Sequence, residues 1–214
     1  MSKGDGIMKN LEKFSTIFLF AGLISFLVAF TVLGIWPAFM TDEIKNTAPE
    51  VTEIPESFKE YFDDLDDYKA AIFEGRDIYI KEACWHCHSQ YVRPVGREHE
   101  RYGLVSTPGE YQNDLNLPHL FGTRRVGPDL SREAGKRSND WHFAHLYNPK
   151  STEPESVMPA YSWYFDESVT PPKPKRGAVA LVAYLQQLGA WQEGILKNQY
   201  DMNSITMPPS PEDQ

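Results

Sequence analysis

Cys84-Trp85-His86-Cys87-His88 is the stretch on which the interpretation of this chain depends. Two thiols three positions apart can each add across a vinyl group of haem, and the histidine that follows then lies under the iron as an axial ligand. The sequence holds no other cysteine, so no thiol remains for a structural disulfide. The motif therefore predicts one covalently bound haem c, attached through Cys84 and Cys87 with His88 on the iron.

A redox disulfide and half of a zinc site are the alternatives for the same two thiols. A thioredoxin-like pair needs a βαβ setting, and nothing upstream of Cys84 has that pattern. A zinc site made from the two cysteines and their two neighbouring histidines would crowd adjacent side chains around one tetrahedral ion. Both alternatives match the motif less well than haem does.

The second axial ligand is expected to be Met158, seventy residues after His88. The proline that follows Met158 fixes the backbone beside the thioether. A methionine that fills a gap in the core is the alternative. The other methionines lie near the N-terminus or in the polar tail: Met1, Met8, Met40, Met202 and Met207. Histidines are rival ligands: His99, His119, His142 and His145. Ligation by histidine and methionine closes both faces of the iron and raises its potential, which suits electron transfer.

Other candidates for the haem pocket lie after the motif. A carbonyl near Pro128, in the turn Gly127-Pro128-Asp129-Leu130, would accept the Nδ1 proton of His88 and turn Nε2 toward the iron. A plain turn explains the same residues equally well. Arginines are candidates to pair with the haem propionates, because planar guanidinium matches a carboxylate; surface arginine is the alternative. These arginines are Arg93, Arg124 and Arg125.

The segment from Phe14 to Thr41 carries no charge and is rich in apolar side chains. As a helix it would be about 40 Å long, more than the ~30 Å hydrocarbon core of a bilayer, so it predicts a transmembrane anchor. A cleaved signal peptide is the alternative, although the apolar run is about twice as long as a normal h-region. Lysines precede the segment and acidic residues follow it. The positive-inside rule therefore places the N-terminus in the cytoplasm and the haem domain outside, in the bacterial periplasm.

The chain divides into a cytoplasmic stub (1–13), the transmembrane anchor (14–41), an acidic linker (42–66), a haem domain (67–191) and a polar tail (192–214). The net charge of −9 argues against nucleic acid as a partner. Much of this charge lies in the linker, which we expect to be solvated. The alternative is that the acidic residues attract a basic electron donor.

Three segments of the haem domain have helical spacing or helix-end signals: 68–83, 139–146 and 176–191. Nothing indicates a substantial sheet. The sequence therefore predicts a mainly α-helical domain with long loops, in which the macrocycle takes part of the space of a core.

These features resemble a class I cytochrome c, a fold in which the first and last helices cross, and the resemblance implies that Gly75 contacts Tyr184. More narrowly, residues from about 74 to 165 resemble the membrane-anchored monohaem subunit (subunit II) of cbb₃-type haem–copper cytochrome c oxidases. The long insertion 89–126 is the most discriminating part. The stretches that match are His88-Ser89-Gln90 with Arg93-Pro94, Glu100-Arg101-Tyr102-Gly103, Gly109-Glu110-Tyr111, Arg125-Val126-Gly127-Pro128-Asp129-Leu130, Asp140-Trp141-His142, Ala144-His145-Leu146 with Asn148-Pro149, Pro154-Glu155-Ser156 and Met158-Pro159-Ala160-Tyr161.

The resemblance implies that the chain relays single electrons from a cytochrome c donor to haem b in the catalytic haem–copper subunit. A further cytochrome c subunit is expected in the same membrane complex, and the insertion 89–126 is expected to dock on the catalytic subunit. The chain would not be an enzyme alone, because it lacks the intramembrane histidines that oxygen reduction needs. The alternatives are the cytochrome c subunit of a nitric oxide reductase, a free-standing anchored shuttle, and a haem enzyme or sensor with an open iron face.

Overall fold

The computed structural model describes residues 3–39, 50–113 and 115–190, which fall into an N-terminal unit (1–45) and a larger unit (46–214). In the N-terminal unit, α1 (Lys3–Ala29) continues into a π-helical turn, η1 (Phe30–Ile35), where the N–H of Trp36 donates to the carbonyl of Thr31. The stretch Phe14–Phe39 is long and apolar enough to cross a membrane. The last two residues of the expected anchor, 40 and 41, lie outside the described residues.

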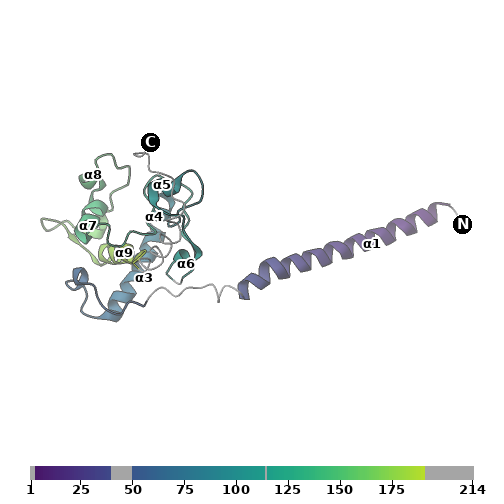
Figure 1. The fold of residues 1–214 in the computed structure, drawn as a ribbon, viewed down its shortest axis with the longest axis horizontal. Coiled ribbons are helices and arrows are strands. Elements are labelled where there is room, and N and C mark those ends of the chain that lie inside the picture. Colours follow the sequence, from purple (N-terminus) through teal and green to yellow (C-terminus); the bar gives the residue numbers. More distant parts are fainter. Residues whose placement is uncertain (1–2, 40–49, 114, 191–214) are drawn as a thin grey trace, which may run out of the picture. The chain divides into compact units, whose positions relative to one another are not determined.

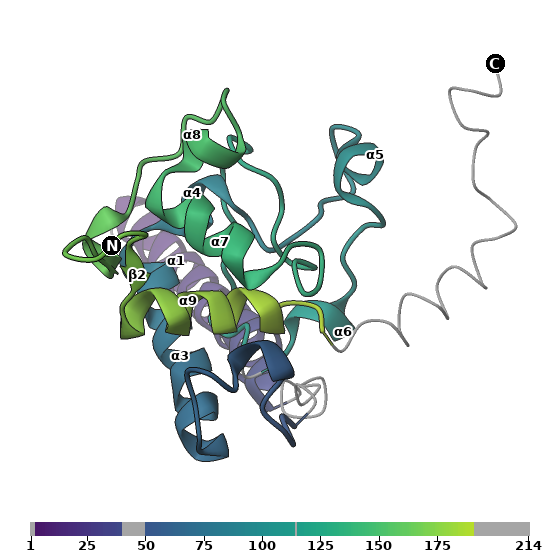
Figure 2. The same ribbon diagram turned by 90° about the vertical axis from the view of Figure 1, so that its left-hand side faces the viewer.

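Two crossed helices form the centre of the larger unit, α3 (Leu65–Lys81) and α9 (Arg176–Gln187) (Figures 1 and 2). The helices meet backbone to backbone at Gly75: a Cβ atom there would overlap the carbonyl oxygen of Ala180 and lie 2.8 Å from the Cβ of Tyr184. The expected neighbour, Tyr184, is thus present, but the tightest approach is to the backbone of Ala180. This crossing agrees with the predicted mainly helical, cytochrome c-like fold.

The ends of the helices differ from the sequence expectations by a few residues. α3 ends at Lys81 because Ala83 adopts a left-handed backbone (φ 57°) that turns the chain sharply. α9 ends at Gln187, where Leu188 is extended and Gly189 is left-handed (φ 80°). The expected end of this helix, Trp191, lies outside the described residues.

Short helices and turns build the rest of the larger unit. α7 (Asn139–Tyr147) starts at Ser138, whose Oγ accepts from the N–H of Trp141 at 3.2 Å. The other elements are η2 (Glu56–Phe58), α4 (Cys84–Cys87), α5 (Glu98–Tyr102), α6 (Pro108–Tyr111), α8 (Pro149–Thr152) and η3 (Ser162–Tyr164). The strands β1 (Phe165–Asp166) and β2 (Lys173–Pro174) pair antiparallel over two residues each. As expected, no substantial sheet is present among the described residues.

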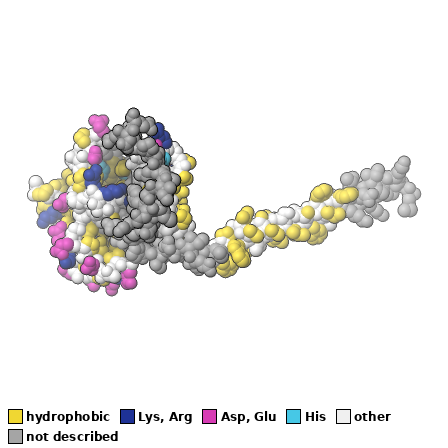
Figure 3. All heavy atoms as spheres, viewed as in Figure 1, with side chains coloured by type: hydrophobic (Ala, Val, Ile, Leu, Met, Phe, Trp, Pro, Cys, Tyr) yellow, Lys and Arg dark blue, Asp and Glu magenta, His cyan; other side chains and the backbone are white. Residues whose placement is uncertain are grey.

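The acidic segment 42–66 is not a solvated linker over its described residues, 50–66. Phe58 and Phe62 are buried, and both rings lie 5.4 Å from the ring of Tyr68 on α3. The apolar side chains of this segment provide core surface for α3, while its carboxylates face solvent along the edge formed by η2 and α3 (Figure 3). The helical domain therefore begins before residue 67, its expected start.

Candidate haem site

A cavity of about 1020 Å³ lies at the C-terminal end of α3 and brings distant parts of the sequence together. Cys84 and Cys87 line it from α4 (Cys84–Cys87), His88 lines it from the position directly after this helix, and Met158 lines it from the loop after α8. Apolar side chains complete the wall: Leu130, Leu146, Tyr161, Leu181 and Leu185. The volume is at the upper end of the ~300–1,000 Å³ typical of small-molecule and cofactor sites.

The crossed helices hold the cysteine motif in place. The left-handed turn at Ala83 joins α3 directly to α4, so α4 begins at the end of the central helix. The hydroxyl of Tyr79, buried at the crossing, donates to the carbonyl of His88. Gln90 Nε2 donates to the hydroxyl of Tyr184 on α9 at 2.8 Å. Both ends of the motif are thereby tied to the α3–α9 crossing.

Neither cysteine forms a disulfide, and both thiols are half-buried at the cavity. Burial raises the pKa of the Cys84 thiol to about 11. Redox-active C-x-x-C pairs have lowered thiol pKa values instead. The surroundings of Cys84 therefore differ from those of a thioredoxin-like pair.

The turn Gly127-Pro128 packs directly on the imidazole of His88. The Nδ1 atom of His88 lies 3.0 Å from the carbonyl oxygen of Pro128. A Cβ atom at Gly127 would overlap the imidazole and lie 2.7 Å from both ring nitrogens, so only glycine leaves room for the ring. Burial lowers the pKa of His88, which favours the neutral imidazole. With Nδ1 bonded to the carbonyl, Nε2 carries the lone pair that a metal requires.

The three arginines expected to bind the haem propionates, Arg93, Arg124 and Arg125, do not line the cavity. Arg93 and Arg125 both pair with the buried carboxylate of Glu98, and Arg125 also donates to Asp129 at 2.7 Å. A buried carboxylate needs such partners, because an unpaired charge away from water is costly. Arg124 is exposed.

Glu98 makes the stability of the domain sensitive to acid. Burial on its own raises the pKa of Glu98, but hydrogen bonds from Arg125 and Arg93 outweigh this effect and lower the pKa to about 2. Because the folded-state pKa lies below the usual 4.5, the ionised carboxylate stabilises the fold above about pH 4.5, and this contribution is lost as the pH falls toward 2.

We expect Glu98→Gln to flatten this acid dependence. At about 1.4 kcal/mol for each pKa unit, the free energy of unfolding of the unsubstituted chain should fall by roughly 3 kcal/mol more than that of the variant between pH 5 and pH 2. Urea unfolding of the full chain in mild detergent, followed by circular dichroism at several pH values, measures the difference. Parallel curves for the two chains would contradict the assignment of this effect to Glu98.

The cations that do line the cavity are Arg101, Lys136 and Arg137, all exposed at its edge. Arg137 lies over the ring of Trp141, with its guanidinium carbon 4.9 Å from the ring centroid. The imidazole of His145 stacks on Trp141 at 4.7 Å. Arg101, Trp141 and His145 lie in stretches that resemble the monohaem subunit. Lys136 and Arg137 lie outside these stretches and have no sequence signal that separates them from surface residues.

Among the described residues, Met158 is the methionine that lines the cavity. Two of the rival histidines, His142 and His145, also line it. His145 Nδ1 is 2.6 Å from Thr152 Oγ1, and His142 Nε2 is 3.7 Å from Glu133 Oε1. Burial lowers the pKa of His142 to about 4. The other two rivals, His99 and His119, do not line the cavity.

The crossed helices and the cavity that holds a C-x-x-C-H motif define a helical domain of the cytochrome c type. The chain belongs to the family of mono-haem subunits of cytochrome c oxidase (FixO), whose family model matches residues 8–173. A comparison with curated proteins gave no match. The family match confirms the resemblance to the monohaem subunit of cbb₃-type oxidases and includes the whole apolar stretch Phe14–Phe39.

The residues present fit the haem that this family implies. Two thiols, an imidazole and a thioether line the same cavity, together with apolar side chains that can pack on a macrocycle. Gly127 leaves open the space that the imidazole of His88 needs, and the Pro128 carbonyl fixes the tautomer that a metal ligand requires. Cationic side chains stand at the edge, where carboxylates would meet water.

Proposed function

We propose that this chain is the membrane-anchored c-type cytochrome that relays single electrons within a cbb₃-type oxidase, from a cytochrome c donor to the haem b and haem–copper centres of the catalytic subunit. One observation carries the proposal: Cys84, Cys87, His88 and Met158, which span seventy-five positions of the sequence, line one cavity. The family match supplies the oxidase context.

Each of these residues has a distinct part in the relay. Cys84 and Cys87 would hold the macrocycle by thioether bonds, and His88 and Met158 would bind its iron. Bound haem supplies a reversible one-electron change of its iron. The thioether of Met158 would keep small ligands away from the iron, and the apolar side chains of the cavity would keep water away from it. An iron ligated on both faces transfers electrons and does not bind oxygen, so the chain is not catalytic alone.

The proposal places the N-terminus in the cytoplasm and the haem domain in the periplasm, with the apolar helix as a single-pass anchor in the inner membrane. Lysines at positions 3, 9 and 13 precede the helix, and the positive-inside rule assigns their side to the cytoplasm. This is the compartment arrangement in which an anchored domain meets both a periplasmic donor and the outer face of a membrane partner.

Purification of the tagged chain from its native membrane in mild detergent tests the function. We expect a complex that contains covalent haem c on this chain, haem b, copper and a partner with many membrane helices. A complex with non-haem iron and no copper would point to a nitric oxide reductase. Covalent haem on a chain without partners would show a free-standing shuttle.

Met158→Ala is expected to lower the reduction potential by a sizeable part of the ~0.8 V that axial ligands span in haem proteins. Loss of the thioether also opens one face of the iron, so the reduced variant should bind carbon monoxide. A redox titration and a difference spectrum with carbon monoxide measure the two effects.

Met202→Ala is the matched control, because it removes a methionine from the C-terminal segment. It should keep the potential of the unsubstituted chain and should not bind carbon monoxide. If Met202→Ala produced both effects and Met158→Ala neither, Met202 would be the ligand and the assignment of Met158 would be wrong.

A further inference from the structure

A network of buried ion pairs links the insertion 89–126 to the turn that contacts His88. Its centre is Arg125, which donates to Glu98 of α5, to Asp129 and to the carbonyl of Tyr91. The side chains are nearly inaccessible, with exposed fractions of 11% for Arg125, 8% for Glu98 and 3% for Asp129. The guanidinium carbon lies 5.1 Å from the ring centroid of Tyr102, a residue that lines the cavity.

Backbone hydrogen bonds, together with Asp129 of this network, hold the turn against the cysteine motif. The N–H of Gly127 donates to the carbonyl of Cys87 at 3.1 Å, and the N–H of Leu130 donates to the carbonyl of Ser89 at 3.0 Å. Asp129 completes the contact, because its Oδ2 accepts both from Arg125 and from the N–H of Tyr91 at 3.0 Å. These hydrogen bonds hold the segments 87–91 and 125–130 side by side. The contact between the Pro128 carbonyl and His88 lies within this pair of segments.

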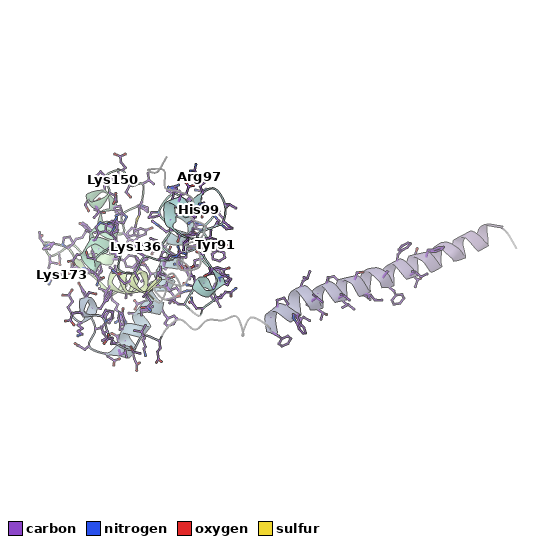
Figure 4. All side chains as sticks on the ribbon, viewed as in Figure 1. Tyr91, Arg97, His99, Lys136, Lys150 and Lys173 are labelled. Atoms are coloured by element: carbon purple, nitrogen blue, oxygen red, sulfur yellow. The ribbon has the colours of Figure 1, made fainter. Side chains whose placement is uncertain are left out.

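Glu98 is the first residue of α5 and is buried. Arg97 and His99, the neighbours of Glu98, are exposed, and Figure 4 shows them on the same side of the domain as Tyr91. Arg93 supplies three hydrogen bonds to Glu98, one from its backbone N–H at 2.9 Å and two from its guanidinium. The hydrogen bonds from Arg93 hold the carboxylate of Glu98 in place. Glu98 can therefore hold the guanidinium of Arg125 in place in turn.

We infer that Arg125 is a positioning residue for the axial histidine: through Glu98, Asp129 and Tyr91 it holds the Pro128 carbonyl against His88 and so tunes the reduction potential. The reason is chemical. A hydrogen bond from Nδ1 makes an imidazole a better electron donor to its metal, and residues around the ligand set this bond. If the carbonyl moves away, the imidazole donates less, the ferric form loses stabilisation, and the potential rises.

The geometry requires the whole guanidinium of Arg125. Its Nε, Nη1 and Nη2 atoms all donate, to three different residues. Lysine keeps the positive charge but has a single ammonium group, which cannot reach all three acceptors from one position. Arg125→Lys therefore loosens the turn without a change in net charge.

The chain offers a matched control in Arg132. Its guanidinium makes two hydrogen bonds to Glu110, at 2.9 and 3.0 Å, and the exposed fractions of the two side chains, 12% and 2%, are close to those of Arg125 and Glu98. Among the described residues, the side-chain hydrogen bonds of Arg132 go to Glu110 and not to residues 87–91 or 125–130. Arg132→Lys therefore disrupts a comparable pair of guanidinium hydrogen bonds without a direct effect on the turn.

The inference rests on the proposed function, and redox titration of the haem c band in the purified complex tests both. We expect Arg125→Lys to raise the potential, Arg132→Lys to leave it unchanged, and both to retain the near-infrared band of methionine-ligated ferric haem. An unchanged potential in Arg125→Lys, or an equal shift in Arg132→Lys, would overturn the inference alone. An unsubstituted chain without bound haem would overturn the proposed function and the inference with it.

If Arg125→Lys does not accumulate in the complex, a second pair of variants tests the same inference about the reduction potential. Glu98→Gln and Glu110→Gln each remove one buried carboxylate that binds an arginine. The loss of negative charge raises the potential slightly in both, so the inference requires a larger upward shift in Glu98→Gln. Equal shifts would overturn it.

Discussion

Gly75→Ala is expected to destabilise the helical domain by roughly 3 kcal/mol or more, although alanine favours a helix over glycine by about 1 kcal/mol. The added Cβ would overlap the carbonyl oxygen of Ala180 and lie 2.6 Å from its carbonyl carbon, and backbone atoms cannot rotate away as a side chain would. The variant must therefore separate α3 from α9. Because the same crossing holds Tyr79 and Tyr184 against the cysteine motif, the haem site should be lost with it.

Ala70→Gly is the control in the same helix, since Ala70 is exposed on α3. It reverses the change in helix propensity and should cost only about 1 kcal/mol. Thermal unfolding of the full chain in mild detergent, followed by circular dichroism, compares the two variants. If Gly75→Ala were as stable as the unsubstituted chain, the helices would not be in backbone contact at this position.

The parts of the fold that could be predicted from sequence depend on local constraints. The thiol spacing of Cys84 and Cys87 is set by the chemistry of attachment and needs no knowledge of the rest of the chain. The helix after Arg176 has an apolar face long enough to be recognised from its spacing. In both cases a few neighbouring residues carry the whole signal, so the prediction did not depend on tertiary contacts.

The parts that could not be predicted depend on partners far away in the sequence. Glu98 stands between Arg97 and His99 in a run of charged residues, a pattern typical of a solvated surface. Its burial depends on Arg125, which is 27 positions later and was expected at the haem propionates. Since charge patterns do not distinguish a buried pair from two surface residues, the ion pair between Glu98 and Arg125 could not be predicted from the sequence.

The acidic segment before α3 also shows that a charge pattern does not reveal which side chains are buried. Its charge indicates a solvated linker, and this is true of the carboxylates, but Phe58 and Phe62 lie in the core. Two aromatic side chains bury enough apolar surface to outweigh the solvation of their charged neighbours, because each can contribute about 2 kcal/mol when buried. Composition averaged over a segment hides such residues, and their position becomes clear only from the structure, in which both rings pack on the ring of Tyr68.

Gly127→Ala should remove His88 from its position and leave the rest of the domain folded. The added Cβ would occupy the space of the imidazole, so the ring must turn away and lose its contact with the carbonyl of Pro128. A steric cost of about 3 kcal/mol corresponds to a loss of roughly a hundredfold in the population with the ring in place. We therefore expect a chain that accumulates in the membrane but has lost the spectrum of a histidine-ligated haem c.

Gly96→Ala separates this effect from the general cost of replacing a glycine. Gly96 has a left-handed backbone (φ 60°) and no atom within 4 Å of its Cβ position, so alanine there costs about 1–2 kcal/mol of backbone strain without any contact with the site. The reduced-minus-oxidised spectrum, recorded with haem staining of the separated chain, should be unchanged in Gly96→Ala and altered in Gly127→Ala. An unaltered spectrum in Gly127→Ala would mean that the imidazole does not occupy the space beside this glycine when haem is bound, and that the turn does not orient the ligand.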